Sequence, residues 1–181
     1  MEIIEEPFKG LYHIKPKVFA DERGYFFESF NRKVFESCTG LDVDFLQDNQ
    51  SKSQKNVLRG LHFQVPPYGQ GKLVRVITGK VLDVVVDLRK ESATYGEHFK
   101  TVLNTEEHNM LWIPPGFAHG FLTLEDDTIF SYKCTAYYNP ESERCIDWAD
   151  SDLGIDWDVS SPVLSKKDQE GMSFKSFSSP F

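Results

Sequence analysis

Short apolar segments, separated by polar turns, recur along the whole chain. They are rich in β-branched and aromatic residues, and clusters of Gly, Pro, Asp and Asn stand between them. This pattern is typical of β-strands joined by turns. We expect strands at residues 11–19, 25–30, 43–49, 56–64, 72–78, 80–88, 98–104, 109–113, 120–124 and 128–138.

Helical signals are few. Asn31 is a good helix cap and Gly40 a good helix end, so residues 31–40 are expected to form one helix. A shorter helix is expected to begin at Ser165, because Asp168 follows it at the spacing of a capping pair.

Many short strands with little helix indicate an all-β fold, an antiparallel barrel or jelly roll. The break at Thr78-Gly79 predicts a hairpin between residues 72–78 and 80–88. The chain has no internal repeat or linker, so we expect a single domain over residues 1–181. The Ser-rich tail, residues 171–181, is expected to be peripheral and ordered only where it docks.

Charge and cysteine content restrict the partners and the compartment. The formal net charge of −8 argues against a general nucleic-acid binder, but it leaves room for a small anionic ligand held by local arginines. The three cysteines show no metal or redox spacing, which favours free thiols in a reducing compartment. The acidic start lacks the apolar core of a signal peptide, and no apolar run reaches membrane length. We expect a soluble cytoplasmic protein without a membrane partner.

The segment VLRGLHFQ, residues 57–64, carries polar residues inside a strand pattern. Strict alternation places one set of side chains toward the barrel interior, namely Leu58, Gly60, His62 and Gln64, and leaves the other set outside, namely Arg59, Leu61 and Phe63. A single inward histidine is often only a hydrogen-bonded core residue. A second one, His119 in PPGFAHG, makes a functional cavity an equal alternative.

One hypothesis for this cavity is a metal site. The spacing of His62 and Gln64, followed by the P-x-G-x2-H motif that ends at His119, resembles the two motifs of the cupin superfamily, a jelly roll that often holds a metal. Lys72, however, stands where an acidic ligand is wanted. A cation opposes metal binding and glutamine is a poor ligand, so this set is incomplete.

The second hypothesis makes His62 a general base. Asp83 or Asp168 is a candidate partner for its ring, Lys72 can stabilise an enolate oxygen, and Tyr132 is a suitable weak acid. Each residue has a structural alternative: Tyr132 as a core aromatic, Lys72 as a solvated strand end, Asp168 as a helix-start residue. Their occurrence together favours the catalytic interpretation.

Eight stretches, in order, resemble the dTDP-4-dehydrorhamnose 3,5-epimerase family from about residue 7 to residue 170: FADERGYFFESF, FLQDNQSKS, NVLRGLHFQ, QGKLVRV, VVDLRKESATYG, WIPPGFAHGF, YKCTAYY and LSKKDQ. The resemblance implies a cupin-type jelly roll without a catalytic metal or other cofactor. It also implies a homodimer that exchanges N-terminal strands. The implied reaction inverts C3 and C5 of a dTDP-4-keto-6-deoxyhexose, both next to the C4 ketone, through an enolate.

The resemblance also assigns roles to residues of this chain. His62 would be the proton acceptor paired with Asp168, Tyr132 the proton donor and Lys72 the enolate stabiliser. The remaining residues would bind the substrate, with the arginines suited to the diphosphate and Tyr138 stacking on thymine: Arg23, Glu28, Gln47, Asp48, Asn49, Arg59, His119, Tyr138, Glu143 and Lys167.

Some alternatives remain open at this stage. They are an epimerase that inverts C3 or C5 only, a metal-dependent cupin and a non-catalytic sugar-nucleotide-binding cupin. The strand at residues 57–64 also poses a geometric problem, because alternation turns Arg59 away from His62 although both should reach one ligand. We therefore predict a bulge or a strong twist near Gly60.

Overall fold

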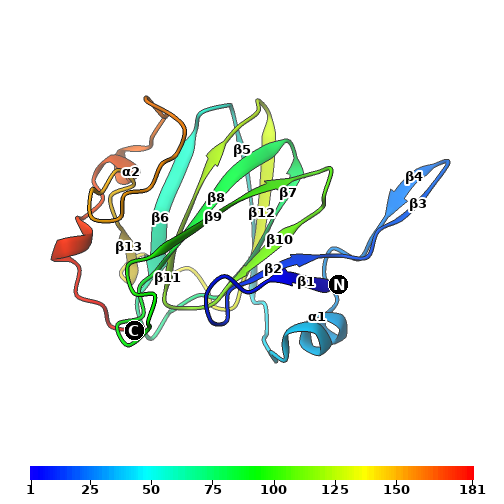
Figure 1. Ribbon diagram of the computed structural model, residues 1–181, viewed down its shortest axis with the longest axis horizontal. Helices are drawn as coiled ribbons and strands as arrows, with labels where there is room; N and C mark the ends of the chain where they lie inside the picture. The colour runs from blue at the N-terminus through cyan, green and yellow to red at the C-terminus, as the bar shows by residue number, and fades with distance from the viewer.

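Two antiparallel sheets form the body of the computed structural model, which describes residues 1–181 (Figure 1). The six-stranded sheet runs in the order β1 (Glu2–Glu5), β2 (Tyr12–Lys15), β10 (Met110–Ile113), β7 (Lys72–Thr78), β12 (Thr128–Cys134) and β5 (Gln47–Ser53). The five-stranded sheet runs in the order β13 (Glu143–Cys145), β6 (Leu58–Gln64), β11 (Phe117–Thr123), β8 (Lys80–Asp87) and β9 (His98–Asn104). The predicted antiparallel jelly roll is confirmed.

The smaller elements lie outside these sheets. β3 (Phe19–Asp21) and β4 (Gly24–Phe26) form a hairpin that projects away from the body (Figure 1). The helices are α1 (Arg32–Thr39), α2 (Lys166–Gln169) and the 3-10 helix η1 (Phe174–Ser176). Asn31 caps α1 and Gly40 ends it, and Ser165 caps α2, as predicted. None of these helices has the length and apolar character needed to cross a membrane.

The hairpin predicted at Thr78-Gly79 is wrong. β7 pairs with β10 and β12, whereas β8 pairs with β9 and β11, so the chain crosses from one sheet to the other at Gly79. Gly79 has φ +85°, and a Cβ there would lie 2.4 Å from the hydroxyl of Thr128. A glycine break between two apolar strands fits a corner between sheets as well as a hairpin, and the sequence pattern does not separate the two.

Other strand boundaries also differ from the sequence pattern. The strand expected at residues 43–49 begins later, at Gln47, and continues to Ser53, and the strand expected at 25–30 ends at Phe26. The short strands β1 and β13 were not predicted. Both lie at sheet edges, where burial on one side only leaves a weak apolar signal.

The two sheets enclose the main hydrophobic core. Alternate residues of β8, Val81 and Val85, face this interior together with Phe121 of β11 and Phe130 of β12. Leu82, Val84 and Val86 face the other way, where residues 146–181, the C-terminal segment, cover them. β8 is therefore buried along nearly its whole length, because both of its faces are covered.

Covering segments close the outer face of each sheet. The C-terminal segment packs on the five-stranded sheet, and its tail docks on β6, with the Phe177 ring 5.1 Å from that of Phe63. α1 packs on the six-stranded sheet through Phe35, whose ring lies 5.5 Å from Trp112. The C-terminal segment is important for the site because it brings α2 against β6.

Candidate active site

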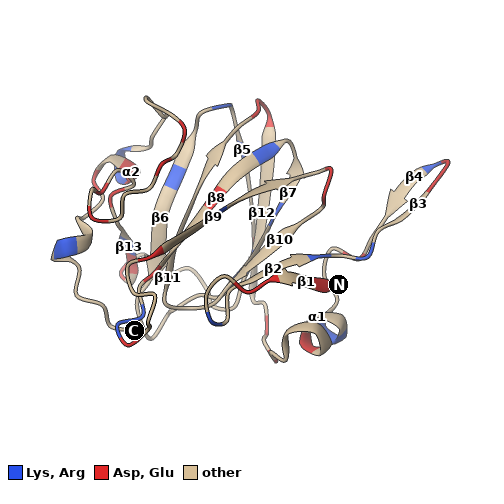
Figure 2. Cartoon of the chain, viewed as in Figure 1, with Lys and Arg blue, Asp and Glu red and all other residues tan.

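β6 contains the predicted irregularity. In its pairing with β11, His62 lies opposite His119 and Arg59 lies opposite Phe121, so two residues of β6 face only one residue of β11. The extra residue restores Arg59 to the same side as His62, and both line one cavity. The predicted bulge is confirmed. Figure 2 shows β6 mostly tan, with a blue band for Lys or Arg along the strand.

The bulge requires glycine at position 60. Gly60 has φ +128°, and a Cβ there would lie 2.5 Å from the Cα of Gly120. One part of the alternation prediction is wrong, because Leu58 joins Leu61 and Phe63 in the outer core instead of facing the cavity with His62. The irregular step at Gly60 changes the side on which every earlier residue of the strand lies.

The cavity between the sheets has two lobes that share His62, Lys72 and Tyr132. The outer lobe is polar and is lined further by Gln47, Asn49, Phe63, Gln64, Gln70, Tyr138 and Glu143. The inner lobe is lined further by Gln50, Ser51, Arg59, His119, Phe121, Phe130, Ser165, Lys167 and Asp168. Eleven predicted site residues therefore come together from β5, β6, β7, β11, β12, β13, α2 and the loop after β12.

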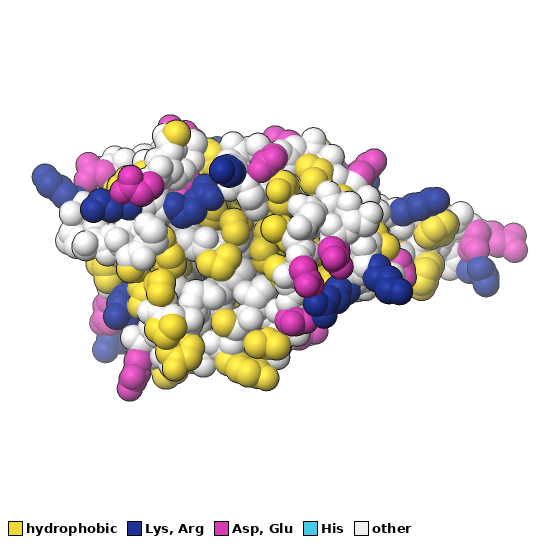
Figure 3. Space-filling view, turned by 90° about the horizontal axis from the view of Figure 1, so that it is seen from below, with side chains coloured by type: hydrophobic (Ala, Val, Ile, Leu, Met, Phe, Trp, Pro, Cys, Tyr) yellow, Lys and Arg dark blue, Asp and Glu magenta, His cyan; other side chains and the backbone are white.

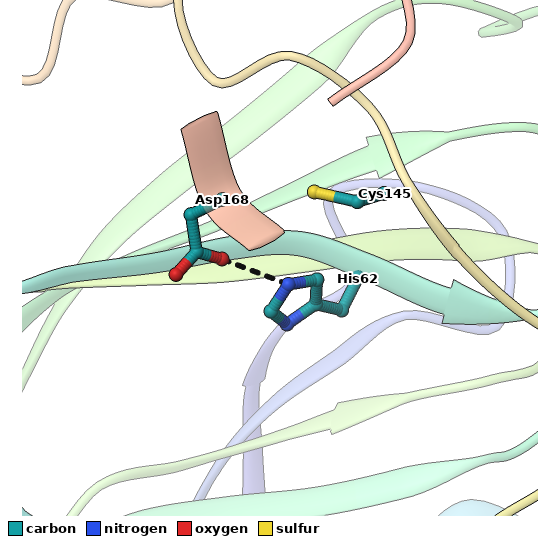
Figure 4. Close-up of side chains that lie close together, drawn as sticks. All are labelled: His62, Cys145 and Asp168. Carbon is teal, nitrogen blue, oxygen red and sulfur yellow. Dashed lines mark ion pairs between the residues drawn. The ribbon is translucent and has the colours of Figure 1, made fainter. Parts of the chain in front are cut away.

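The side chains of His62 and Asp168 contact each other at the boundary of the two lobes (Figure 4). Nε2 of His62 lies 2.8 Å from Oδ1 of Asp168, and the other ring nitrogen points away from the carboxylate. No protein group bonds that second nitrogen. Of the two partners left open by the sequence, Asp168 is therefore the one that contacts His62, and it leaves one ring nitrogen free to exchange a proton.

The Asp168 carboxylate is ionised and buried, with only 3% of the residue exposed. Burial by itself raises the pKa of a carboxyl group, but contacts from His62, Ser165 and the N–H of Gly60 outweigh it and lower the pKa of Asp168 to about 2. Gly60 lies in the bulge of β6, and its backbone nitrogen is 3.1 Å from Oδ1 of Asp168. The irregular step in β6 thus both aligns Arg59 with His62 and helps to hold the carboxylate.

The second histidine has its own carboxylate. Nε2 of His119 lies 2.9 and 3.0 Å from the two oxygens of Asp83, and both residues are buried. Asp83 lies between Val81 and Val85 on the inward face of β8. Its pairing fixes the ring of His119 against the inner lobe, opposite His62 on the neighbouring strand.

Lys72 and Tyr132 are the remaining groups common to both lobes. Burial lowers the pKa of Lys72, and nearby acidic groups counteract part of that effect. Its ammonium lies 3.5 Å from the carbonyl oxygen of His62. Burial raises the pKa of Tyr132, which keeps its phenol protonated at neutral pH. A base, a cation and a weak acid around one space are the parts needed to remove and return a proton next to a carbonyl group.

The mouth of the outer lobe is built on two glutamines. Gln64 donates to the carbonyl oxygens of Tyr68 and Tyr137 at 2.7 and 3.2 Å and accepts from the N–H of Asn139. Gln47 accepts from the N–H of Tyr138 at 2.9 Å. These bonds fix the loop that presents the exposed Tyr138 ring beside the cavity.

A charged pair borders the same mouth. Glu143 accepts from the hydroxyl of Tyr138 at 2.6 Å and pairs with Lys167. Burial raises the pKa of Glu143, but the contacts from Lys167 and Tyr138 outweigh it, so the pKa is lowered. Lys167 lies one residue before Asp168 and lines the inner lobe with it, so the pair of Lys167 with Glu143 joins the inner lobe to the outer one.

Three predicted site residues lie outside this cavity. Asp48 faces the opposite side of β5 from Gln47 and Asn49 and pairs with Lys133 at 2.9 Å. Arg23 lies at the tip of the β3–β4 hairpin with its side chain 85% exposed, and its side chain contacts only Asp21. Glu28 follows the same hairpin and accepts from Asn31. The cavity is thus assembled without these three side chains.

Several lining residues were missed by the sequence analysis. Ser51 has a buried hydroxyl without a partner, and Ser53 accepts from the guanidinium of Arg59 at 3.2 and 3.3 Å. The signal was the run of seven polar residues QDNQSKS, which forms β5 and contributes Gln47, Asn49, Gln50 and Ser51 to the cavity lining.

The donor atoms in the cavity do not form a good metal site. The side-chain amide of Gln64 is hydrogen-bonded to loop backbone, Lys72 is a cation, and the ring of His119 is bonded to Asp83. His62, Cys145 and Asp168 do lie together, with donor atoms within 4.8 Å of one another (Figure 4). Both oxygens of Asp168 already have partners, however, and burial and Asp168 raise the pKa of the Cys145 thiol to about 12. A metal prefers a thiolate, which this environment opposes.

Comparison with known proteins identifies the family. The family model for dTDP-4-dehydrorhamnose 3,5-epimerase matches residues 5–176. The chain belongs to the dTDP-4-dehydrorhamnose 3,5-epimerase family. A relative of that name from Shigella flexneri is 51% identical over 174 residues, which cover 96% of this chain and 96% of the relative.

Solved structures of epimerases agree with this assignment. The dTDP-4-dehydrorhamnose 3,5-epimerase from Elizabethkingia anophelis is 48% identical, with a TM-score of 0.92 over 97% of each chain. A dTDP-6-deoxy-D-glucose-3,5-epimerase from Legionella pneumophila, in complex with dTDP-4-keto-L-rhamnose, is 46% identical. Its TM-score is 0.93, over 98% of this chain and 94% of that one. The family resemblance seen in the sequence and its cupin-type jelly roll are both confirmed.

Proposed function

We propose that this protein is a dTDP-4-dehydrorhamnose 3,5-epimerase that uses the cavity between the sheets as its active site. The substrate is dTDP-4-dehydro-6-deoxy-D-glucose and the product dTDP-4-dehydro-L-rhamnose. The observation that carries the proposal is the His62–Asp168 pair beside Lys72 and Tyr132, in a chain about half identical to epimerases of that name.

The first step removes a proton from C3 or C5. The free nitrogen of His62 accepts it, and Asp168 stabilises the imidazolium that forms, since it is a buried anion 2.8 Å away. A positioned base contributes about 10²–10⁴-fold, or roughly 3–5 kcal/mol, which is too little alone to ionise a C–H bond. Lys72 adds further stabilisation of the transition state by holding a positive charge against the enolate oxygen at C4.

The second step returns a proton on the opposite face of the ring. Tyr132 is the donor, because its buried phenol stays protonated at neutral pH and belongs to the sheet that faces β6 across the cavity. His62 and Tyr132 then exchange their protons with solvent. No electron transfer is involved, and the reaction balances with a proton removed and a proton returned at each carbon.

Substrate binding uses the polar lining of both lobes. Arg59 and Lys167 supply positive charge for the diphosphate, and His119 hydrogen-bonds the sugar region. The exposed ring of Tyr138 stacks on thymine, beside Gln47, Asn49 and Glu143. These contacts are remote from the reacting carbons, and their binding energy orients the sugar between base and acid.

The remaining predicted ligand residues point to a dimer. The β3–β4 hairpin carries exposed aromatic rings at Phe19, Tyr25 and Phe26, the last 65% exposed. Figure 3 shows yellow hydrophobic side chains on the arm that projects from the body. Such a surface favours burial against another chain. We infer a homodimer in which the hairpin of one subunit carries Arg23 and Glu28 to the cavity of the other.

Asp48 has no such role, because its side chain lies away from its own cavity and pairs with Lys133. The reduced cysteines fit a cytoplasmic enzyme.

Deuterium incorporation tests this function. The purified protein is given the 4-keto sugar nucleotide in D₂O, and C3 and C5 are followed separately by NMR. The proposal expects inversion with deuterium at both carbons. Exchange at one carbon only would identify a mono-epimerase, and absence of exchange at both would overturn the proposal.

A further inference from the structure

The two oxygens of the Asp168 carboxylate have different partners. Oδ1 faces β6, where it accepts from the N–H of Gly60 at 3.1 Å and lies 2.8 Å from His62. Oδ2 is contacted by Ser165 alone, through the hydroxyl at 2.5 Å and the backbone N–H at 3.3 Å. The oxygen that does not face the base is therefore held entirely by one serine.

The contact between these residues is reciprocal. The N–H of Asp168 donates to the hydroxyl oxygen of Ser165 at 3.2 Å while that hydroxyl donates to the carboxylate. This capping box closes a helix that is only four residues long. The carboxylate can turn about two side-chain bonds, and Asp168 is buried beneath the exposed Ser165, so the donors to Oδ2 come from Ser165.

We propose that Ser165 is a positioning residue of the epimerase, whose hydroxyl fixes the rotation of the Asp168 carboxylate so that Oδ1 stays against His62. The inference rests on the proposed function, in which His62 is the base. Without the hydroxyl, Oδ2 retains only the longer contact from the backbone N–H, and the carboxylate turns toward other donors. The imidazolium then loses part of its stabilisation in the step that removes the proton.

A purely structural role for Ser165 makes a different prediction. As a helix cap alone, Ser165 would affect the folding of the C-terminal segment and leave turnover unchanged below the unfolding temperature. Glycine separates the two roles, because it is tolerated at helix caps nearly as well as serine but has no hydroxyl. Threonine keeps both the cap and the hydroxyl.

The experiment compares Ser165→Ala, Ser165→Gly and Ser165→Thr with wild type, measuring kcat, KM and the melting temperature. Ser173→Ala is the matched control, because Ser173 caps η1 in the same C-terminal segment and is exposed, away from the dyad. We expect kcat to fall about tenfold in the Ala and Gly variants with KM nearly unchanged, since orientation of the base is impaired and substrate contacts are intact. The Thr variant and the control should retain kcat.

The outcomes separate this inference from the function on which it rests. Wild-type kcat in Ser165→Gly, at a temperature where it is folded, would overturn the positioning role and leave the epimerase proposal intact. If Ser165→Ala does not fold, the kcat values of Ser165→Gly and Ser165→Thr still test the positioning role, because they differ in the hydroxyl. A wild-type protein that exchanges no deuterium would overturn the proposed function, and the inference with it.

Discussion

His62 on β6 and Asp168 on α2 lie 2.8 Å apart, although they stand in distant parts of the chain. The five-stranded sheet supplies His62, the proposed base, and the segment that covers the outer face of that sheet supplies the carboxylate. In the proposed mechanism, catalysis therefore depends on the docking of the C-terminal segment against that sheet.

The first prediction concerns His62. We expect His62→Ala to abolish deuterium exchange at both C3 and C5, because one base serves both carbons, while dTDP binding measured by calorimetry persists. His98→Ala on β9, outside the cavity, is the control and should exchange normally. Residual exchange at either carbon in His62→Ala would assign that carbon to another base.

The second prediction separates the two proton transfers. Tyr132→Phe removes the acid and leaves His62 and Asp168 in place. We expect inversion to slow by about 10²–10⁴-fold, the usual contribution of a positioned acid. His62 should still exchange the proton it removes, so recovered substrate in D₂O should carry deuterium with retained configuration, detectable by NMR and mass spectrometry. Inversion at the wild-type rate would show that the proton comes from another group.

The third prediction is a pH dependence of stability. The pKa of Asp168 falls from 3.8 to about 2 on folding, so ionised Asp168 stabilises the folded protein above about pH 4. This contribution, about 2 kcal/mol, is lost as the pH falls from 4 toward 2. We expect wild type to exceed Asp168→Asn in free energy of unfolding at pH 7, and the difference to narrow below pH 4. Urea titrations from pH 7 to below pH 4 measure the free energies of unfolding of both proteins. A difference between them that does not change with pH would contradict a lowered pKa of Asp168.

The fourth prediction tests the bulge. Gly60→Ala adds a methyl group 2.5 Å from the Cα of Gly120 at a φ that favours glycine, so we expect a loss of about 3 kcal/mol or more. Gly40→Ala is the control, because Gly40 also has positive φ but has open space around it. It should cost about 1 kcal/mol, and equal losses in the two variants by urea unfolding would contradict a steric requirement at Gly60.

Local patterns in the sequence were sufficient for the elements that local physics determines. The caps of α1 and α2 follow from Asn31, Gly40 and Ser165. The bulge was predicted with the help of the family resemblance, because the resemblance implied that Arg59 and His62 reach one ligand and strict alternation places them on opposite faces. The pairing of the strands was harder to predict from the sequence. A glycine at position 79 permits a hairpin or a corner, and only the packing of both sheets selects the corner.

The site shows the same division. Residue types alone offered both Asp83 and Asp168 as partners for His62, and the family resemblance pointed to Asp168. The tertiary arrangement pairs Asp83 with His119 and Asp168 with His62. The inward serines of β5 were missed because a polar strand has no apolar pattern to mark its buried face. The position of Arg23 outside its own cavity could not be read from the sequence, because a motif records order along the chain and not distance.

The fifth prediction follows from that position of Arg23. If the hairpin acts across a dimer, Arg23→Ala and His62→Ala impair the same cavity from different chains. Mixing the two variants after reversible unfolding should then restore activity, because a mixed dimer has one cavity with an intact His62 that receives an intact Arg23. Statistical mixing gives about a quarter of all cavities in this state. Each variant refolded alone is the control, and a mixture no more active than their average would show that Arg23 does not act on the partner's cavity.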